Sequence, residues 1–172
     1  MWDWRNGSVP AFQAGGGGSN PLSHTKRKKG VIMKKVIDCF DGEYRFLSNF
    51  YEATVFYDNI LCRTSESAFQ MMKTLDAEER LKIGKAHPSE AKRRGRKVQL
   101  REDWEQIKYQ VMFEIVLAKF SQHPDLKEKL LATGDAELIE GNWWNDTYWG
   151  VCNGVGENNL GKILMKIRKI LK

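Results

Sequence analysis

One short segment, Ser65–Lys73, carries four side chains that could act together. Residues three, four and seven positions apart lie on the same side of a helix. The residues with this spacing are Glu66, Phe69, Gln70 and Lys73. A carboxylate, an amide and an amine beside an aromatic ring can line a polar site. Spacing alone favours another account, in which Glu66 caps the helix, Phe69 packs and Lys73 is solvated.

A second segment, Gly141–Gly150 (GNWWNDTYWG), interleaves three tryptophans and a tyrosine with asparagine and aspartate. Aromatic faces with polar groups between them are typical of a pocket for a planar ring. A structural loop anchored by tryptophans is a nearly equal alternative. A third segment, Gly154–Gly161, is a glycine-rich turn before a helix, which can present backbone N–H groups to a phosphate. It is not a dinucleotide fingerprint, because Asn159 replaces the third glycine.

The stretch Lys82–Arg101 contains eight basic side chains and one acid, Glu90. Most of it is expected to be a solvated face, and one or two members could hold an anionic substrate or a nucleic-acid backbone.

Length and composition set the frame for these segments. The chain of 172 residues is 41% hydrophobic and 29% charged, which predicts one packed domain. No apolar run of about 18 residues predicts a membrane span, and no secretory signal is recognisable, so a cytoplasmic protein is expected. Three widely spaced cysteines and three scattered histidines indicate neither a disulfide scaffold nor a metal site. We therefore expect no metal and no cofactor.

The net charge of +6 is concentrated near the start of the chain. Residues 1–32 hold five of the 28 basic residues and one of the 22 acidic ones, so residues 33–172 are nearly neutral. This first segment also contains the GGGGS sequence of a flexible linker. We interpret 1–32 as a disordered leader, a linker or an added tail, with Met33 as a natural start. The alternative is a basic arm for phosphate backbones or nuclear import.

The remaining pattern predicts an α+β domain that is mainly helical. The aromatic segment Tyr44–Tyr57, followed by Asp58-Asn59 and Ile60–Cys62, predicts a hairpin near the N-terminus. Capping residues and apolar periodicity predict the helices and one further strand. The expected helices are 65–75 after Thr64, one from Asp76, one from Pro88 to Gly95, 101–120, 124–131 and one from Asn158; a brief strand is expected at 136–140.

In order and spacing, these segments resemble the NADAR family of YbiA-like N-glycosidases, over about Phe40 to Leu171. The matching motifs are YRFLSNFY at 44–51, SESAFQMMK at 65–73, AKRRG at 91–95, LREDW at 100–104, Lys119-Phe120, LATGD at 131–135, EGN at 140–142, Trp149-Gly150 and NLGKILMKIR at 159–168. The resemblance implies a single compact domain that hydrolyses an N-glycosidic bond. It implies substrates such as ribosylamino-pyrimidine phosphates of the riboflavin pathway, or ADP-ribose attached to guanine in DNA.

Within that family chemistry, a carboxylate near C1 would stabilise the positive charge that develops on the ribose. The expected catalytic residues are Glu66, Lys73 and Asp146, with Lys73 as a possible Schiff-base nucleophile. The expected substrate-binding residues are Arg45, Ser48, Asn49, Phe50, Gln70, Arg101, Trp104, Glu140, Trp143, Trp144, Trp149 and Lys162. The expected partners are a small phosphorylated riboside, ADP-ribose or ADP-ribosylated DNA, and no membrane.

Two other functions remain open from the sequence. A non-catalytic module that binds ADP-ribose or a nucleotide would keep the aromatic wall and the basic groups. A helical DNA-binding domain would bind plain duplex with a steep salt dependence.

Overall fold

The computed structural model describes residues 35–172. The predicted leader, 1–32, lies outside the described residues.

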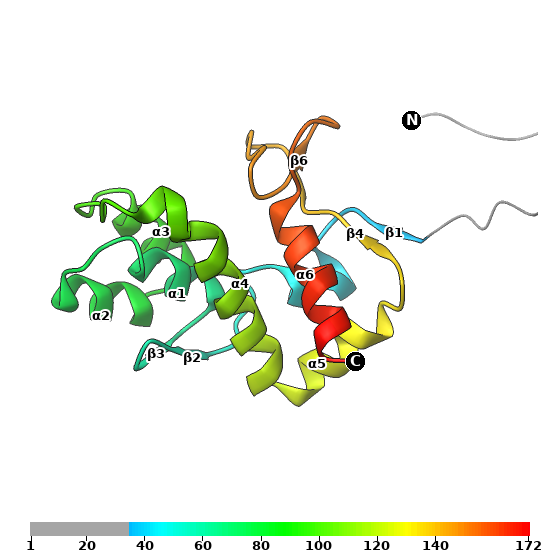
Figure 1. The fold of residues 1–172 in the computed structure, drawn as a ribbon, viewed down its shortest axis with the longest axis horizontal. Helices are drawn as coiled ribbons and strands as arrows, with labels where there is room; N and C mark the ends of the chain where they lie inside the picture. The colour runs from blue at the N-terminus through cyan, green and yellow to red at the C-terminus, as the bar shows by residue number, and fades with distance from the viewer. Residues whose placement is uncertain (1–34) are drawn as a thin grey trace, which may run out of the picture. The chain divides into compact units, whose positions relative to one another are not determined.

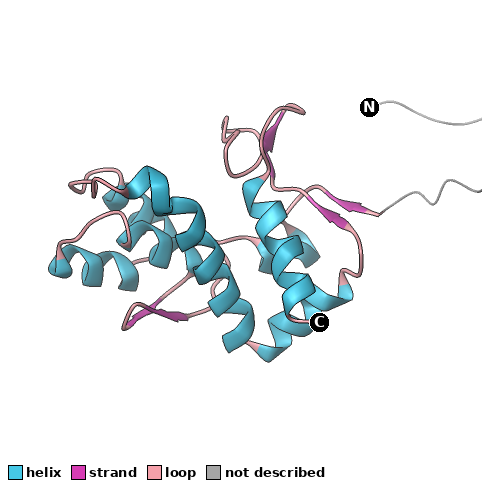
Figure 2. Ribbon diagram, in the orientation of Figure 1, coloured by secondary structure: helices cyan, strands magenta, loops and turns pink. Residues whose placement is uncertain are grey.

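Helices make up most of the described chain, as Figures 1 and 2 show. They are the 3-10 helix η1 (Gly42–Leu47) and the α-helices α1 (Ser65–Met71), α2 (Ala77–Lys85), α3 (Pro88–Gly95), α4 (Trp104–Gln122), α5 (Pro124–Ala132) and α6 (Asn159–Ile170). The predicted α+β class with a dominant helical content is confirmed.

The strands form three two-stranded sheets in the described chain. They are the parallel pair β1 (Val36–Ile37) and β4 (Glu137–Leu138), the antiparallel pair β2 (Val55–Tyr57) and β3 (Ile60–Cys62), and the parallel pair β5 (Gly141–Asn142) and β6 (Val151–Cys152). The predicted hairpin is the β2–β3 pair. Its turn residues Asp58 and Asn59 have φ angles of 48° and 62°, the left-handed conformation that a two-residue hairpin turn requires.

The first part of the aromatic segment is not a strand, which corrects the prediction for Tyr44–Tyr57. Residues Gly42–Leu47 form η1, and only Val55–Tyr57 pair with β3. Gly42, with a φ of 52°, turns the chain into η1, and Phe46 and Leu47 on this short helix are buried. The aromatic content of this segment therefore reflects burial and not extended backbone.

Capping side chains set the starts of α1 and α2 as predicted, whereas α4 begins at Trp104 and not at residue 101. Thr64 accepts a hydrogen bond from the Ser67 backbone N at the start of α1, and Asp76 accepts one from Glu79 N at the start of α2. Helix α1 ends at Met71, four residues earlier than predicted, so Lys73 lies in the turn after the helix and not on the predicted helical face. Within the following segment, Thr74 Oγ1 accepts a hydrogen bond from Asp76 N.

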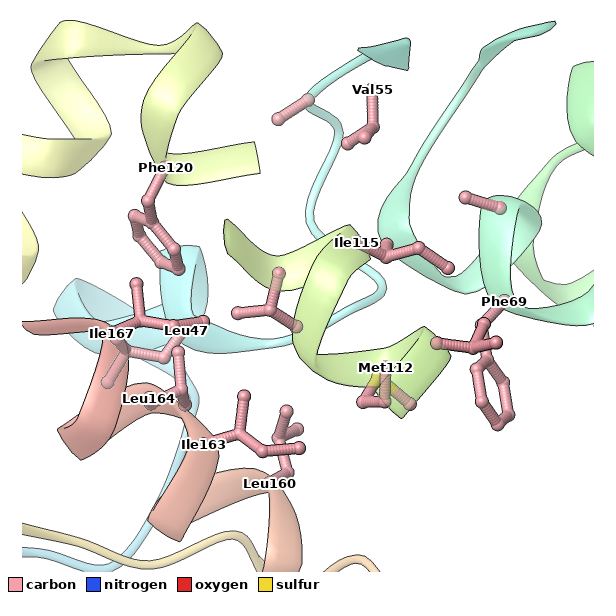
Figure 3. Close-up of a cluster of buried hydrophobic side chains, with 14 of the residues drawn as sticks. Leu47, Val55, Phe69, Met112, Ile115, Phe120, Leu160, Ile163, Leu164 and Ile167 are labelled. Carbon is pink, nitrogen blue, oxygen red and sulfur yellow. The ribbon is translucent and has the colours of Figure 1, made fainter. Parts of the chain in front are cut away.

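Helix α4 lies between α1 and α6 and packs on both of them (Figure 1). In Figure 3, Met112 and Ile115 of α4 lie near Phe69 of α1, while the apolar side chains of α6 gather near Leu47 and Phe120. The apolar periodicity that predicted this last helix corresponds to its buried face at Leu160, Ile163, Leu164 and Ile167, while Leu171, also expected in the core, is only partly buried. This shared core fixes α1 relative to the C-terminal part of the domain.

Candidate functional site

A cavity of about 180 Å³ joins segments that are far apart in the sequence. Its walls come from the turn after η1, from α1, α3 and α4, and from the chain between β4 and β6. The lining residues are Asn49, Phe50, Glu66, Phe69, Gln70, Lys73, Lys92, Met112, Glu140, Trp144, Asp146 and Trp149. The structure thus brings the 65–73 segment and the tryptophan-rich segment to one place.

Helix α1 places a carboxylate in this cavity. Glu66 is 7% exposed, and its Oε1 atom accepts a hydrogen bond of 2.9 Å from Gln70 Nε2, one turn later. The Glu66 backbone N donates to Asn49 O at 3.0 Å, which ties α1 to the turn after η1. Glu66 therefore does not cap the helix with its side chain. Phe69 does pack in the core, and it also lines the cavity.

Burial changes the proton affinity of Glu66 on α1 and of Lys73 in the turn after it. It raises the pKa of Glu66, although the Gln70 hydrogen bond and the nearby ammonium groups oppose this effect. Burial also lowers the pKa of Lys73, with the Glu66 carboxylate opposing. The Lys73 Nζ atom lies 5.9 Å from the ring centroids of both Phe69 and Trp104. Lys73 is therefore a partly desolvated amine next to a carboxylate.

The tryptophan-rich segment is folded tightly around Asp146. The Asn142 side chain donates to Asp146 O at 2.8 Å and accepts from Asp146 N at 3.1 Å. Asp146 Oδ1 in turn accepts from Trp149 N at 2.9 Å. The Trp149 ring meets Phe69 edge to face, with centroids 5.4 Å apart. These contacts hold one carboxylate and one aromatic face at the cavity.

The glycine-rich turn 154–161 supports this segment through its backbone amides. The backbone N–H groups of Glu157, Asn159 and Leu160 donate to carbonyls of 147–149, at 2.7, 3.3 and 3.0 Å. Gly156 packs so closely that a Cβ there would lie 2.1 Å from Gly150 O. The phosphate-binding interpretation is therefore wrong for these amides.

Two further charged groups complete the cavity wall. Burial, with Asp146 and Glu66 close by, raises the pKa of Glu140 to about 8. Lys92 of α3 opposes that shift, and its Nζ atom lies 5.5 Å from the Phe50 ring centroid. The sequence did not single out Lys92 among eight basic residues. The pattern that could have identified Lys92 is the pair of small residues beside it on α3, Ala91 and Gly95. Both are buried and let α3 pack close to α1.

Two buried amide oxygens at the cavity have no hydrogen-bond partner among the described residues. They are Asn49 Oδ1 and Gln70 Oε1. Gln70 Oε1 packs against Gly95 of α3. Because buried polar atoms are nearly always paired, Asn49 Oδ1 is suited to a donor from a bound molecule.

Several predicted substrate-binding residues lie outside the cavity lining. Trp104 is buried behind it, with its ring centroid 5.0 Å from that of Phe69. Arg101 pairs with Asp103, Nε to Oδ1 at 2.6 Å, and borders a separate, more open cleft of about 910 Å³. Trp143 is 85% exposed and packs edge to face on Trp144, with centroids 5.5 Å apart.

Three more of the predicted substrate-binding residues, Ser48, Arg45 and Lys162, also lie outside the cavity lining. Ser48 Oγ accepts from Phe50 N at 3.2 Å and so shapes the turn that carries Asn49. Arg45 on η1 and Lys162 on α6 are exposed. None of the three lines the cavity.

Metal ligands do not gather at this site. Among residues 35–172, no group of three or more histidine, cysteine, aspartate or glutamate side chains could hold a metal ion. Over the same residues, no helix has the length and apolar content needed to cross a membrane.

Comparisons with known proteins agree on one family. The family model described as the NADAR domain matches residues 38–172. The chain is 42% identical over 152 residues to N-glycosidase YbiA of Shigella flexneri serotype 5b, covering 85% of this chain and 94% of that protein. It is 38% identical over 136 residues to riboflavin biosynthesis protein VVA0006 of Vibrio vulnificus, covering 77% of this chain and 37% of that protein. The NMR structure of the E. coli protein YbiA is similar, with a TM-score of 0.72 and 39% identity, over 81% of this chain and 87% of that one.

Proposed function

The chain belongs to the NADAR family, and on that basis we propose that it is an N-glycosidase that hydrolyses the C1–N bond of a phosphorylated riboside. The observation that carries this proposal is the cavity itself. Three carboxylates, a partly desolvated lysine and aromatic walls surround a space of about 180 Å³.

The carboxylates supply what this reaction needs. As the C1–N bond breaks, positive charge builds on the ribose, and a fixed anion close to C1 stabilises that state more than the ground state. Glu66 is suited to this role because Gln70 fixes its carboxylate with one hydrogen bond. Asp146 is fixed by Trp149 N and can orient the water that attacks C1.

Lys73 supplies the nucleophile in the route that we favour. Its lowered pKa increases the fraction of neutral amine, which can add to C1 of an opened sugar and form a Schiff base that water then hydrolyses. In direct hydrolysis, by contrast, Lys73 would only contribute charge.

A small ribosylamino-pyrimidine phosphate is the substrate class that we favour. The relative from Vibrio vulnificus is named for riboflavin biosynthesis, and the cavity is small. Asn49 Oδ1 can accept a hydrogen bond from a ribose hydroxyl, and Lys92 can pair with a phosphate. A second candidate, ADP-ribosyl-guanine, is favoured by the exposed Trp143–Trp144 pair beside the cavity, which can stack on a further base.

The test is to incubate the protein with each of the two compounds and to measure free base and free sugar phosphate or ADP-ribose by chromatography. Release from either compound supports an enzyme and identifies its class. Binding without release would assign a non-catalytic nucleotide module instead. Affinity for unmodified duplex that falls steeply with salt would assign a DNA-binding domain.

A further inference from the structure

Two hydrogen bonds and one close packing contact hold the backbone of Glu140. Its N–H donates to Asn158 Oδ1 at 3.1 Å, and its C=O accepts from Val151 N at 2.9 Å. Gly150 packs against the same carbonyl, where a Cβ would lie 2.2 Å from Glu140 O. These contacts fix the direction of the Glu140 Cα–Cβ bond, and the side chain lines the cavity.

The Glu140 carboxyl itself makes no hydrogen bond or ion pair with any side chain or backbone group in the described part of the chain. This separates it from its two neighbours, since Glu66 accepts from Gln70 and Asp146 accepts from Trp149 N. Its oxygens are therefore free to meet a bound molecule.

The charges around Glu140 favour its protonated form. Asp146 and Glu66 are the two acids that act on it, Lys92 is the cation that opposes them, and Lys73 lines the same cavity. Burial and the two like charges outweigh Lys92 and raise the pKa of Glu140 to about 8. At neutral pH the cavity thus holds one protonated carboxyl beside two other acids.

The proposed reaction needs such a proton donor. When the C1–N bond breaks, its electron pair stays on the nitrogen of the base or amine, and a poor leaving group of this kind must take up a proton. Water, or Lys73 followed by water, forms the new bond to C1 and gives up a proton in return. The donor ends as a carboxylate and regains that proton, so atoms and charge balance over one turnover.

We propose that Glu140 is the general acid that protonates the departing nitrogen. Glu66 and Asp146 then act at C1 of the sugar, where they stabilise positive charge and orient water. Glu140 acts at the nitrogen of the base, which it protonates. This inference rests on the proposed N-glycosidase function.

The test compares Glu140→Gln with wild type on whichever of the two ribosyl compounds is cleaved. Glutamine keeps the shape of the side chain but cannot act as an acid, so kcat should fall by about 10²–10⁴-fold with little change in KM. In wild type, kcat should fall as the pH rises and Glu140 loses its proton. In the variant, the remaining kcat should not show this fall. The matched control is Glu137→Gln, an exposed residue on β4, which should leave kcat and the pH profile unchanged.

Two further measurements separate this role from a structural one. In Glu140→Ala, added formate should restore part of kcat, because a small acid can occupy the space of the missing carboxyl. Carbon-13 NMR of side-chain carboxyls should show one group titrating near pH 8 that is absent in Glu140→Gln. If wild type releases no base, the proposed function fails and this role fails with it. If wild type releases base and Glu140→Gln retains its kcat or its alkaline limb, this role alone is wrong.

Discussion

Gln70 holds Glu66 through a buried hydrogen bond of 2.9 Å between Gln70 Nε2 and Glu66 Oε1. The same amide fills the space between α1 and α3. A Cβ on residue 95 of α3 would lie 2.1 Å from Gln70 Oε1, so only glycine fits there without a shift. The position of the Glu66 carboxylate therefore depends on the close approach of two helices.

Replacing Glu66 with glutamine should remove catalysis and leave folding intact. Glutamine has the same shape and can still accept from Gln70, but it carries no charge to stabilise the developing cation. We expect kcat to fall by about 10²–10³-fold, the usual effect of losing one fixed electrostatic group. The control is Glu128→Gln on the exposed face of α5, which should keep wild-type kcat. A Glu66→Gln enzyme with full activity and an unchanged melting curve would exclude Glu66 from catalysis.

A methyl group at position 95 should disturb the site through Gln70. Gly95→Ala forces Gln70 to move, and overpacking of this kind costs about 1–3 kcal/mol of unfolding free energy. We expect activity to fall as well, because the Glu66 carboxylate loses its hydrogen bond. The double variant Gly95→Ala/Gln70→Ala removes the clash and should recover part of the stability in urea unfolding. Strictly additive effects would show that Gln70 does not transmit the change.

The role of Lys73 as a nucleophile can be tested by trapping. Cyanoborohydride reduces a Schiff base to a stable amine, so intact-protein mass spectrometry during turnover should show the mass of the sugar added at Lys73. Lys73→Arg keeps the charge but cannot form the imine, and it should give no adduct and lose activity. Lys85→Arg, an exposed change on α2, is the control. Turnover without any adduct in wild type would assign direct hydrolysis.

The sequence predicted best what depends on neighbours along the chain. Thr64 and Asp76 set helix starts through hydrogen bonds three residues away, and the apolar period of α6 identified its buried face. The hairpin turn at Asp58-Asn59 was recognisable for the same reason. Along Tyr44–Leu47 the same kind of reasoning failed, because aromatic residues are buried equally well on η1 and on a strand.

The candidate site was predictable only where its residues stand in recognisable motifs. Helical spacing predicted that Glu66 and Lys73 lie together, and both line the cavity although α1 ends before Lys73. Spacing could not show which other residues they meet. Lys92 reaches the cavity because α3 packs on α1, and no local pattern distinguishes it from its basic neighbours. Arg101 was predicted to bind substrate but does not line the cavity. Its guanidinium instead pairs with Asp103, two residues later.

Lys119 gives a prediction about pH and stability. This lysine is 1% exposed, and its Nζ atom donates to Phe46 O at 2.6 Å and to Ser48 O at 3.0 Å. Burial lowers its pKa to about 7, from an ordinary value near 10.5 in the unfolded chain. Between pH 7 and pH 9 the unfolded state therefore binds more protons than the folded state, by up to one, and the free energy of unfolding should rise with pH.

Lys119→Met should lose that dependence. Relative to this variant, wild type should gain up to about 2 kcal/mol of unfolding free energy between pH 7 and pH 9, measured by urea unfolding. The variant should also raise KM, because the carbonyls of 46 and 48 that Lys119 holds fix the turn that carries Asn49 and Phe50 to the cavity. Lys127→Met on α5 serves as the control for removing a lysine elsewhere, and it should keep the wild-type slope and KM. Equal pH slopes in wild type and Lys119→Met would mean that Lys119 keeps its proton in the folded protein throughout this range.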